Sequence, residues 1–290
     1  MPKACIIRPA ELDADTPPDL NGFFPCIVAE GDSWFSLGSV PPKNILQELD
    51  FSTHSAVVNL AFPGDTAADL RRALKSSGRK HVDSWLSEFG RIVCDRSSYS
   101  YAAILLSAGG NDLIDAVPHL LKRGINYADA DPAQPQQIVD ESALAQFDTF
   151  LLDNLSALLR FVRDQPSPNR DAPVFIHTYD YPTPNDAPAT VLGGRIGEAW
   201  LYPNLVAAGV PSVLWQPLMR YLLDHLAGQL SALALPDFHV VRTTGLLVPA
   251  ALGATGASGD WENEIHPTSG GYRKIARRLV DAISAELGLP

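Results

Sequence analysis

The stretch Glu30-Gly31-Asp32-Ser33-Trp34-Phe35 directly follows an apolar run at residues 23–29. A short, unbroken apolar run of this kind is typical of a strand that is buried on both faces of a sheet. The Gly-Asp-Ser that follows places Ser33 at the carboxyl end of the strand, which is the edge where open α/β sheets bind their ligands. Ser33 is therefore a candidate catalytic nucleophile.

Four further apolar runs predict strands, at residues 55–62, 101–108, 173–179 and 238–243. Helical patterns separate these runs, among them 81–89, Ser142–Arg163 with apolar residues at helical spacing, and 268–287. Strands that alternate with helices and show little polar–apolar alternation predict a parallel sheet covered on both faces. The expected fold class is α/β, a three-layer α/β/α sandwich with a central parallel five-stranded sheet.

The chain is expected to form one domain over residues 1–290, because no linker, repeat or low-complexity tract divides it. Residues 1–20 are polar and rich in proline after a short apolar piece, and they predict an N-terminal arm. Residues 124–138 and 180–198 are predicted to be loop insertions near the site, since loops of this length inside a domain tend to be functional.

Composition narrows the class of partner. The formal net charge of −11 argues against nucleic acid or an anionic membrane surface. No secretory signal and no apolar run long enough for a membrane span are visible, so a cytoplasmic location is expected. The three cysteines form no CxxC pair and predict free thiols. The histidines show no metal-ligand spacing, and no metal or cofactor is expected.

Four residues stand at predicted strand ends or in late loops: Ser33, Gly64, Asn111 and His266. Acyl transfer requires such a set. A serine hydroxyl needs an adjacent base, which is usually histidine. The tetrahedral intermediate needs donors for its oxyanion, and the backbone N–H groups of Ser33 and Gly64 and the Asn111 carboxamide can supply them.

Four sequence blocks resemble those of the GDSL, or SGNH, hydrolases, and they occur in that family's order across nearly the whole chain. The blocks are Gly31-Asp32-Ser33, Asn59 through Gly64-Asp65-Thr66, Gly109-Gly110-Asn111-Asp112, and His266-Pro267. The resemblance implies a flavodoxin-like sandwich and metal-free hydrolysis of an ester or thioester through an acyl-enzyme. It also implies that Ser33 is the nucleophile, His266 the base, and Ser33, Gly64 and Asn111 the oxyanion hole. The GxSxG elbow of α/β-hydrolases is absent.

The position three residues before His266 departs from that family, which usually has Asp there; this chain has Asn263. An asparagine can orient the imidazole but cannot stabilise an imidazolium by charge. In a protease triad, an Asp-to-Asn change at the orienting position costs about 10⁴ in rate. We therefore expect a nearby carboxylate to serve instead, first Glu264, then Glu262 or Asp260. A Ser–His pair oriented by a backbone carbonyl is the remaining alternative.

Aromatic residues near the predicted site suggest a substrate pocket. Trp34 and Phe35 are either core residues or one wall of an acyl pocket, and Tyr179 and Tyr181 are candidates for another wall. These rings favour an apolar or aromatic acyl group on a small-molecule ester or thioester, although long-chain lipase activity and removal of a sugar acetyl group stay open. The alternative from another class is a non-catalytic binding module with an impaired triad.

Overall fold

A computed structural model describes residues 3–37, 43–72, 89–95, 99–191 and 194–290 of the chain. At its centre lies a parallel sheet of six strands. In spatial order these are β1 (Cys5–Ile7), β3 (Ala56–Asn59), β2 (Cys26–Gly31), β4 (Ala103–Ser107), β5 (Val174–His177) and β8 (Phe238–Val241). Because helices cover this sheet, the predicted α/β sandwich is confirmed.

The sheet has one strand more than the five predicted. The extra strand, β1, lies inside the predicted N-terminal arm and pairs with the edge of β3, with Cys5 opposite Ala56. The Ala4 N–H also donates to the Leu49 carbonyl at 3.1 Å. Only Ile7 of the three strand residues is buried. A strand this short shows no periodicity, so its pairing depends on contacts with distant residues.

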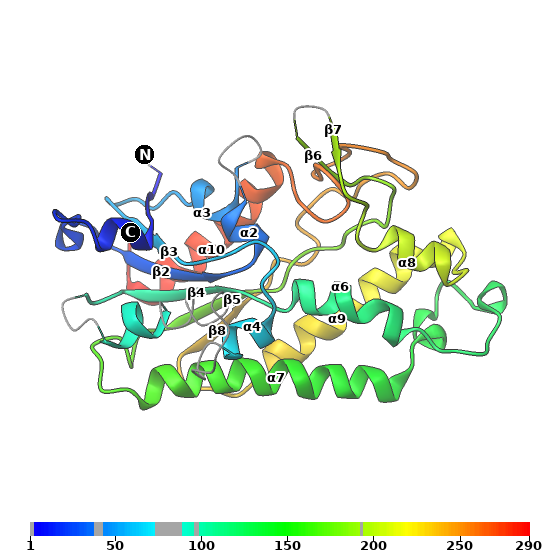
Figure 1. Cartoon of the computed structure of the whole chain (residues 1–290), viewed down its shortest axis with the longest axis horizontal. Coiled ribbons are helices and arrows are strands. Elements are labelled where there is room, and N and C mark those ends of the chain that lie inside the picture. Colours follow the sequence, from blue (N-terminus) through cyan, green and yellow to red (C-terminus); the bar gives the residue numbers. More distant parts are fainter. Residues whose placement is uncertain (1–2, 38–42, 73–88, 96–98, 192–193) are drawn as a thin grey trace.

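Helices form a layer on each side of the sheet (Figure 1). On one side lie α2 (Ser33–Ser36), α3 (Ile45–Glu48) and α10 (Ser269–Leu287), and on the other α4 (Ala67–Arg72) and α7 (Glu141–Asp164). Beyond the carboxyl ends of the strands lie α6 (Gly110–Leu120), α8 (Tyr202–Ala207) and α9 (Trp215–Ala232). The shorter elements are α1 (Pro9–Leu12), η1 (Leu20–Gly22), η2 (Arg91–Asp95), η3 (Tyr127–Asp129), η4 (Pro135–Ile138), η5 (Ser212–Leu214), β6 (Ala189–Val191) and β7 (Gly194–Ile196).

The long helices begin at side-chain caps and bury one face. The Asp140 carboxylate accepts the Ala143 N–H at the start of α7, and the Thr268 hydroxyl accepts the Gly271 N–H at the start of α10. On α7 the buried residues recur at helical spacing, from Leu144 through Leu151 and Leu158, as the sequence pattern predicts. These faces pack on strands whose own residues are almost all inaccessible.

The strand order determines where a ligand can bind. Without the edge strand β1, the order along the chain is second, first, third, fourth, fifth, which is the flavodoxin-like arrangement. In such sheets the crevice lies between the first and third strands, where the direction of winding reverses. Here these strands are β2 and β4. Ser33 follows the carboxyl end of β2, and Asn111 follows the carboxyl end of β4.

The predicted loop insertions differ in position. Residues 124–138 follow the far end of α6, away from the strand ends (Figure 1), and none of them lines the cavity described below. Asp180 and Pro182 of the other insertion do line it, and β6 and β7 pair as a small antiparallel hairpin. Most of the helix predicted at 81–89 falls outside the described residues.

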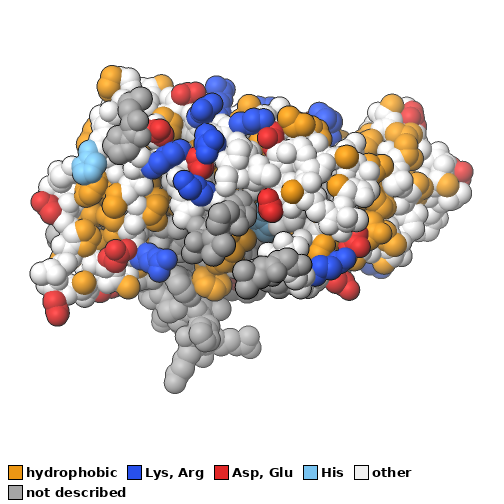
Figure 2. Space-filling view, turned by 90° about the horizontal axis from the view of Figure 1, so that it is seen from above, with side chains coloured by type: hydrophobic (Ala, Val, Ile, Leu, Met, Phe, Trp, Pro, Cys, Tyr) orange, Lys and Arg blue, Asp and Glu red, His pale blue; other side chains and the backbone are white. Residues whose placement is uncertain are grey.

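Charge is unevenly distributed over the surface. Glu48 is buried at the end of α3 and accepts hydrogen bonds from Lys3 and Arg273, both at 2.8 Å. Figure 2 shows a face on which Lys and Arg side chains gather, interspersed with Asp and Glu. Among the described residues, no helix has both the length and the apolar character required to cross a bilayer.

Candidate active site

Ser33 occupies the first turn of α2, immediately behind the central strand β2. Gly31 pairs with Ser107 on β4, and a Cβ at Gly31 would lie 2.3 Å from the Ser107 carbonyl oxygen. Only glycine therefore fits at the point where the chain turns toward Ser33. Asp32 then caps α2, because its Oδ1 accepts the Trp34 N–H at 3.0 Å.

His266 lies next to the Ser33 hydroxyl. Its Nε2 is 2.9 Å from Ser33 Oγ, and its Nδ1 is 3.1 Å from Asn263 Oδ1. The same Asn263 oxygen accepts the backbone N–H groups of Ile265 at 3.1 Å and His266 at 2.9 Å. Since this atom accepts from two fixed donors, it is the amide oxygen, and Nδ1 therefore carries the proton. Nε2 is then free to accept the serine proton.

A further hydrogen bond holds the two halves of this pair together. Trp34, the residue after Ser33, donates from its indole Nε1 to the carbonyl of Ile265, the residue before His266, at 3.1 Å. The Trp34 ring stacks on His177 with centroids 5.4 Å apart and an interplanar angle of 10°. Trp200 contacts His266 edge-on at 5.3 Å. The Ser33–His266 distance is thus fixed by packing on both sides.

The prediction that Glu264 orients His266 is wrong. Glu264 is only 2% exposed, and its carboxylate accepts the backbone N–H groups of Asn185, Trp200, Leu201 and Tyr202. Burial raises the pKa of this carboxyl, and the four N–H groups oppose that shift. Its function here is to anchor the segment that leads into α8. The imidazole is not oriented by the other two candidate carboxylates either. Asp260 pairs with Lys274, and Glu262 contacts His266 only through its backbone N–H, which donates to the His266 carbonyl at 2.8 Å; Nδ1 instead contacts Asn263.

The two remaining oxyanion candidates lie side by side. One N–H of the Asn111 carboxamide donates to the Asp65 carbonyl at 2.9 Å, which places Asn111 against the residue after Gly64. Asp112 accepts the Ala67 N–H at 2.9 Å and so fixes the start of α4 to the first turn of α6. Gly64 is exposed and has a φ of 90°, a conformation that favours glycine.

A buried hydrogen-bond network lies behind Ser33, across the ends of β2, β4 and β5. The Tyr179 N–H donates to His177 Nδ1 at 3.2 Å, so His177 Nε2 carries the proton and donates to Ser107 Oγ at 2.8 Å. The Ser107 hydroxyl donates to Asp32 Oδ1 at 2.7 Å, and the Tyr179 hydroxyl donates to Asp32 Oδ2. This network fixes Asp32, which in turn fixes the turn that carries Ser33.

Burial shifts the ionisation of the site in two directions. It lowers the pKa of His266 to about 4 and of His177 to about 3, so both rings are neutral at pH 7. It raises the pKa of Asp32 to about 6, although the hydrogen bonds to its oxygens oppose the shift. Burial and the nearby carboxylates of Asp69 and Asp32 raise the pKa of Asp65 to about 7. A neutral His266 is the form that can accept a proton.

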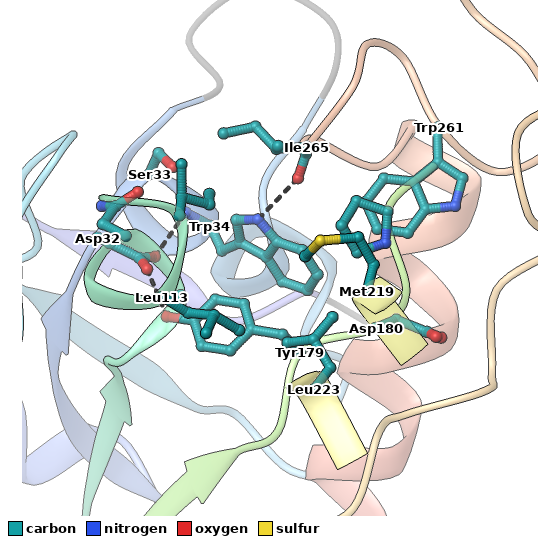
Figure 3. Close-up of a pocket in the computed structure, with 14 residues that line it drawn as sticks. Asp32, Ser33, Trp34, Leu113, Tyr179, Asp180, Met219, Leu223, Trp261 and Ile265 are labelled. Atoms are coloured by element: carbon teal, nitrogen blue, oxygen red, sulfur yellow. Dashed lines mark hydrogen bonds between the residues drawn. The ribbon is translucent and has the colours of Figure 1, made fainter. Parts of the chain in front are cut away.

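A cavity opens beside Ser33 (Figure 3). Of the predicted pocket residues, Trp34 and Tyr179 line it, whereas Phe35 is fully buried in the core. Tyr181 is not in the wall; its hydroxyl donates to Asp224 at 2.6 Å and Arg220 lies over its ring. The sequence interpretation missed most of the wall: Gly110, Leu113, Ile114, Asp180, Pro182, Met219, Leu223, Trp261 and Ile265.

The described residues contain no group of three or more His, Cys, Asp or Glu side chains arranged to hold a metal ion. The two acidic residues that line the cavity, Asp32 and Asp180, have their oxygens engaged by backbone and side-chain donors. What the arrangement offers chemically is a hydroxyl, an adjacent neutral imidazole and a set of N–H donors.

No family model matches the chain, and no curated protein sequence matches it. Similar solved structures include an extracellular lipase from Streptomyces rimosus, 17% identical, with a TM-score of 0.44 over 89% of this chain and 99% of that one. A catalytic mutant of an acetylxylan esterase from Geobacillus stearothermophilus is 15% identical, with a TM-score of 0.44 over 90% and 95% of the two chains. A carbohydrate acetylesterase family member from Sinorhizobium meliloti is 14% identical, with a TM-score of 0.45 over 91% and 99%. Similarity at this level assigns no activity to this chain.

Proposed function

We propose that this protein is a serine hydrolase that cleaves carboxylic esters through an acyl-enzyme. One observation carries the proposal: the 2.9 Å contact between Ser33 Oγ and His266 Nε2, with the opposite ring nitrogen held by Asn263 at 3.1 Å. This is the nucleophile–base–orienting-group arrangement that acyl transfer requires. The topological switch point at which it lies adds support.

In the proposed reaction, Ser33 Oγ attacks the ester carbonyl carbon while His266 Nε2 takes its proton. The N–H groups of Ser33 and Gly64 and the free carboxamide N–H of Asn111 stabilise the oxyanion of the tetrahedral intermediate. His266 then returns the proton to the departing alcohol oxygen, which leaves Ser33 acylated. Water, activated by the same imidazole, hydrolyses the acyl-enzyme and releases the carboxylic acid. Thioesters fit the same sequence of steps, with a thiol as the leaving group.

Asn263 limits how strongly the proposed site can stabilise a protonated His266. It fixes the tautomer of His266 but supplies no negative charge for the imidazolium that forms in each transition state. The same neutral residue favours the second candidate, a non-catalytic binding module with an impaired triad. The two candidates differ in one measurable property, which is the reactivity of Ser33.

The test uses p-nitrophenyl esters and a fluorophosphonate probe, with Ser33→Ala as control. A hydrolase shows turnover and labelling in the wild-type chain and neither in Ser33→Ala. A binding module shows no Ser33-dependent turnover and no labelling, and that result would refute the proposed function. A thioester panel run in parallel identifies the preferred leaving group.

A further inference from the structure

The cavity beside Ser33 has walls made mainly of hydrocarbon. On α6, Ile114 follows Asn111 by one helical turn, and on α9 Met219 and Leu223 are one turn apart, so each pair faces the same side of its helix. Met219 lines the same cavity as Trp34 and Trp261, whose rings contact each other edge-on with centroids 6.3 Å apart (Figure 3). The two helices therefore present apolar side chains to one space that begins at the nucleophile.

The two carboxylates and the phenol in the wall are already engaged, whereas the buried Trp261 indole Nε1 has no hydrogen-bond partner among the described residues. Asp32 and Tyr179 are hydrogen-bonded to each other. The Asp180 carboxylate accepts three backbone N–H groups, those of Tyr181, Gly245 and Leu247, each at 2.7 Å. A hydroxyl, sugar or charged group placed in this cavity would lose its hydration without gaining a partner from the two carboxylates or the phenol, which is unfavourable. The cavity therefore suits an aliphatic group.

The position of His266 indicates which part of an ester, the acyl part or the alcohol part, enters the cavity. Ser33 and the oxyanion candidate Asn111 both line the cavity, whereas His266 does not. His266 must protonate the departing oxygen, so the alcohol part of the ester has to lie on its side of Ser33. The cavity on the Asn111 side is then left for the acyl part.

The space beside Ser33 is small. Gly110 admits the Tyr179 ring into the wall, because a Cβ at Gly110 would lie 2.6 Å from that ring. The cavity volume is about 30 Å³, and one water-sized group needs roughly 10–15 Å³ on this measure. Two or three such groups fit behind the carbonyl carbon. A longer chain would have to displace Met219 or Leu223.

We propose that this cavity is the acyl pocket and that it restricts the enzyme to short aliphatic acyl groups, acetyl to butyryl. This inference rests on the proposed ester hydrolysis and adds the substrate class. Because the pocket ends at α9, the proposed substrate class differs from that of a long-chain lipase. The pocket does not restrict the length of the alcohol part of the ester.

The test measures kcat/KM for two ester series on the intact chain. In the first series the alcohol is always p-nitrophenol, and the acyl group runs through acetate, butyrate and octanoate. In the second series the acyl group is always acetyl, and the alcohol runs from methyl to octyl. Hydrolysis in this series is measured by the release of acid. The wild-type chain is expected to prefer butyrate to octanoate by at least about tenfold, and to discriminate less along the alcohol series.

The pocket variant is Leu223→Ala, and its matched control is Leu222→Ala. Both leucines are buried on α9, at 3% and 1% exposure, but only Leu223 lines the cavity. Leu223→Ala is expected to raise the octanoate-to-butyrate ratio of kcat/KM by about tenfold. Leu222→Ala removes the same atoms from the core and is expected to leave that ratio at the wild-type value even if it lowers Tm.

The outcomes separate the pocket from the chemistry. If fluorophosphonate labels Ser33 but octanoate is hydrolysed as well as butyrate, or only the alcohol series shows discrimination by length, the acyl pocket is refuted and the hydrolase stands. The pocket is also refuted if both leucine variants change the ratio equally. Absence of labelling and of turnover with every ester refutes the hydrolase, and the acyl pocket falls with it.

Discussion

Replacing Asn263 by aspartate is the sharpest test of the proposed catalytic centre. The substitution keeps an oxygen at the position 3.1 Å from His266 Nδ1 and still accepts the backbone N–H groups of Ile265 and His266. It adds a negative charge where the amide nitrogen now stands. Asn263 is half-buried, so water can solvate the second carboxylate oxygen. The fold is therefore expected to tolerate the change.

The size of the effect follows from the distance between the charges. Two unit charges about 4 Å apart interact by about 1 kcal/mol in water and about 4 kcal/mol at an effective dielectric constant near 20. The half-buried Asn263 lies between these limits, and one pKa unit corresponds to about 1.36 kcal/mol. Asn263→Asp is expected to raise the pKa of His266 by about one to three units from its value of about 4. The plateau of kcat/KM is expected to rise by about tenfold or more, because the same attraction stabilises the imidazolium in the transition state.

The assay is the pH dependence of kcat/KM on p-nitrophenyl acetate. The base must be neutral to accept a proton, so the acid limb of the kcat/KM profile reports the pKa of His266 in the free enzyme. This limb should move to higher pH in Asn263→Asp. Glu262→Gln, which removes a neighbouring charge without touching the imidazole, serves as control and should leave the limb in place. If Asn263→Asp is no faster than the wild-type chain and its limb does not move, the assignment of Asn263 as the orienting group is refuted.

Three further predictions concern the residues that support the site. Tyr179→Phe removes a hydrogen bond to the buried Asp32 carboxylate and should lower the free energy of unfolding by about 1.5–3 kcal/mol in urea titrations, more than Tyr181→Phe at a part-exposed position. Glu264→Gln leaves two of the four backbone N–H groups without an acceptor and should cost about 2 kcal/mol or more, yet leave the acid limb of the rate profile unmoved; a shifted limb would restore Glu264 as the orienting group. His177 has a folded-state pKa of about 3 against 6.5 when unfolded, so the unfolded chain binds the proton first and stability falls as pH drops below 6.5. About 3 kcal/mol should be lost from this ring between pH 6.5 and 4, and His177→Gln should show a correspondingly flatter pH dependence of unfolding; equal slopes would contradict the buried neutral ring.

The sequence was a good guide to the sheet because each central strand is buried on both faces and therefore consists of consecutive apolar residues. The same reasoning missed β1, which has one buried residue in three and is held by pairing with β3. An edge strand gains its stability from backbone hydrogen bonds to a distant partner. Those bonds leave no trace in the local pattern of side chains.

The positions of the proposed catalytic groups were also predictable, for a different reason. Ser33 and Asn111 directly follow strands that lie side by side, so their order along the chain brings them to one edge. The partner of His266 was predicted wrongly because charge was weighed above spacing. Asn263 has the spacing that brings its oxygen to Nδ1, whereas Glu264 faces the backbone N–H groups of residues more than sixty positions away. No local pattern shows that a carboxylate is engaged by remote backbone donors.

The walls of the cavity are the part that the sequence does not distinguish from core. Met219 and Leu223 recur at helical spacing on α9 together with Leu222 and Leu226, and all four are buried. An apolar side chain that faces a cavity and one that faces packed neighbours avoid water for the same reason, so periodicity treats them alike. The proposed nucleophile and base carry unusual chemistry and can be found one residue at a time. In the proposed acyl pocket, the length of the acyl group depends instead on the distance between two helices, and that distance is a property of the folded chain alone.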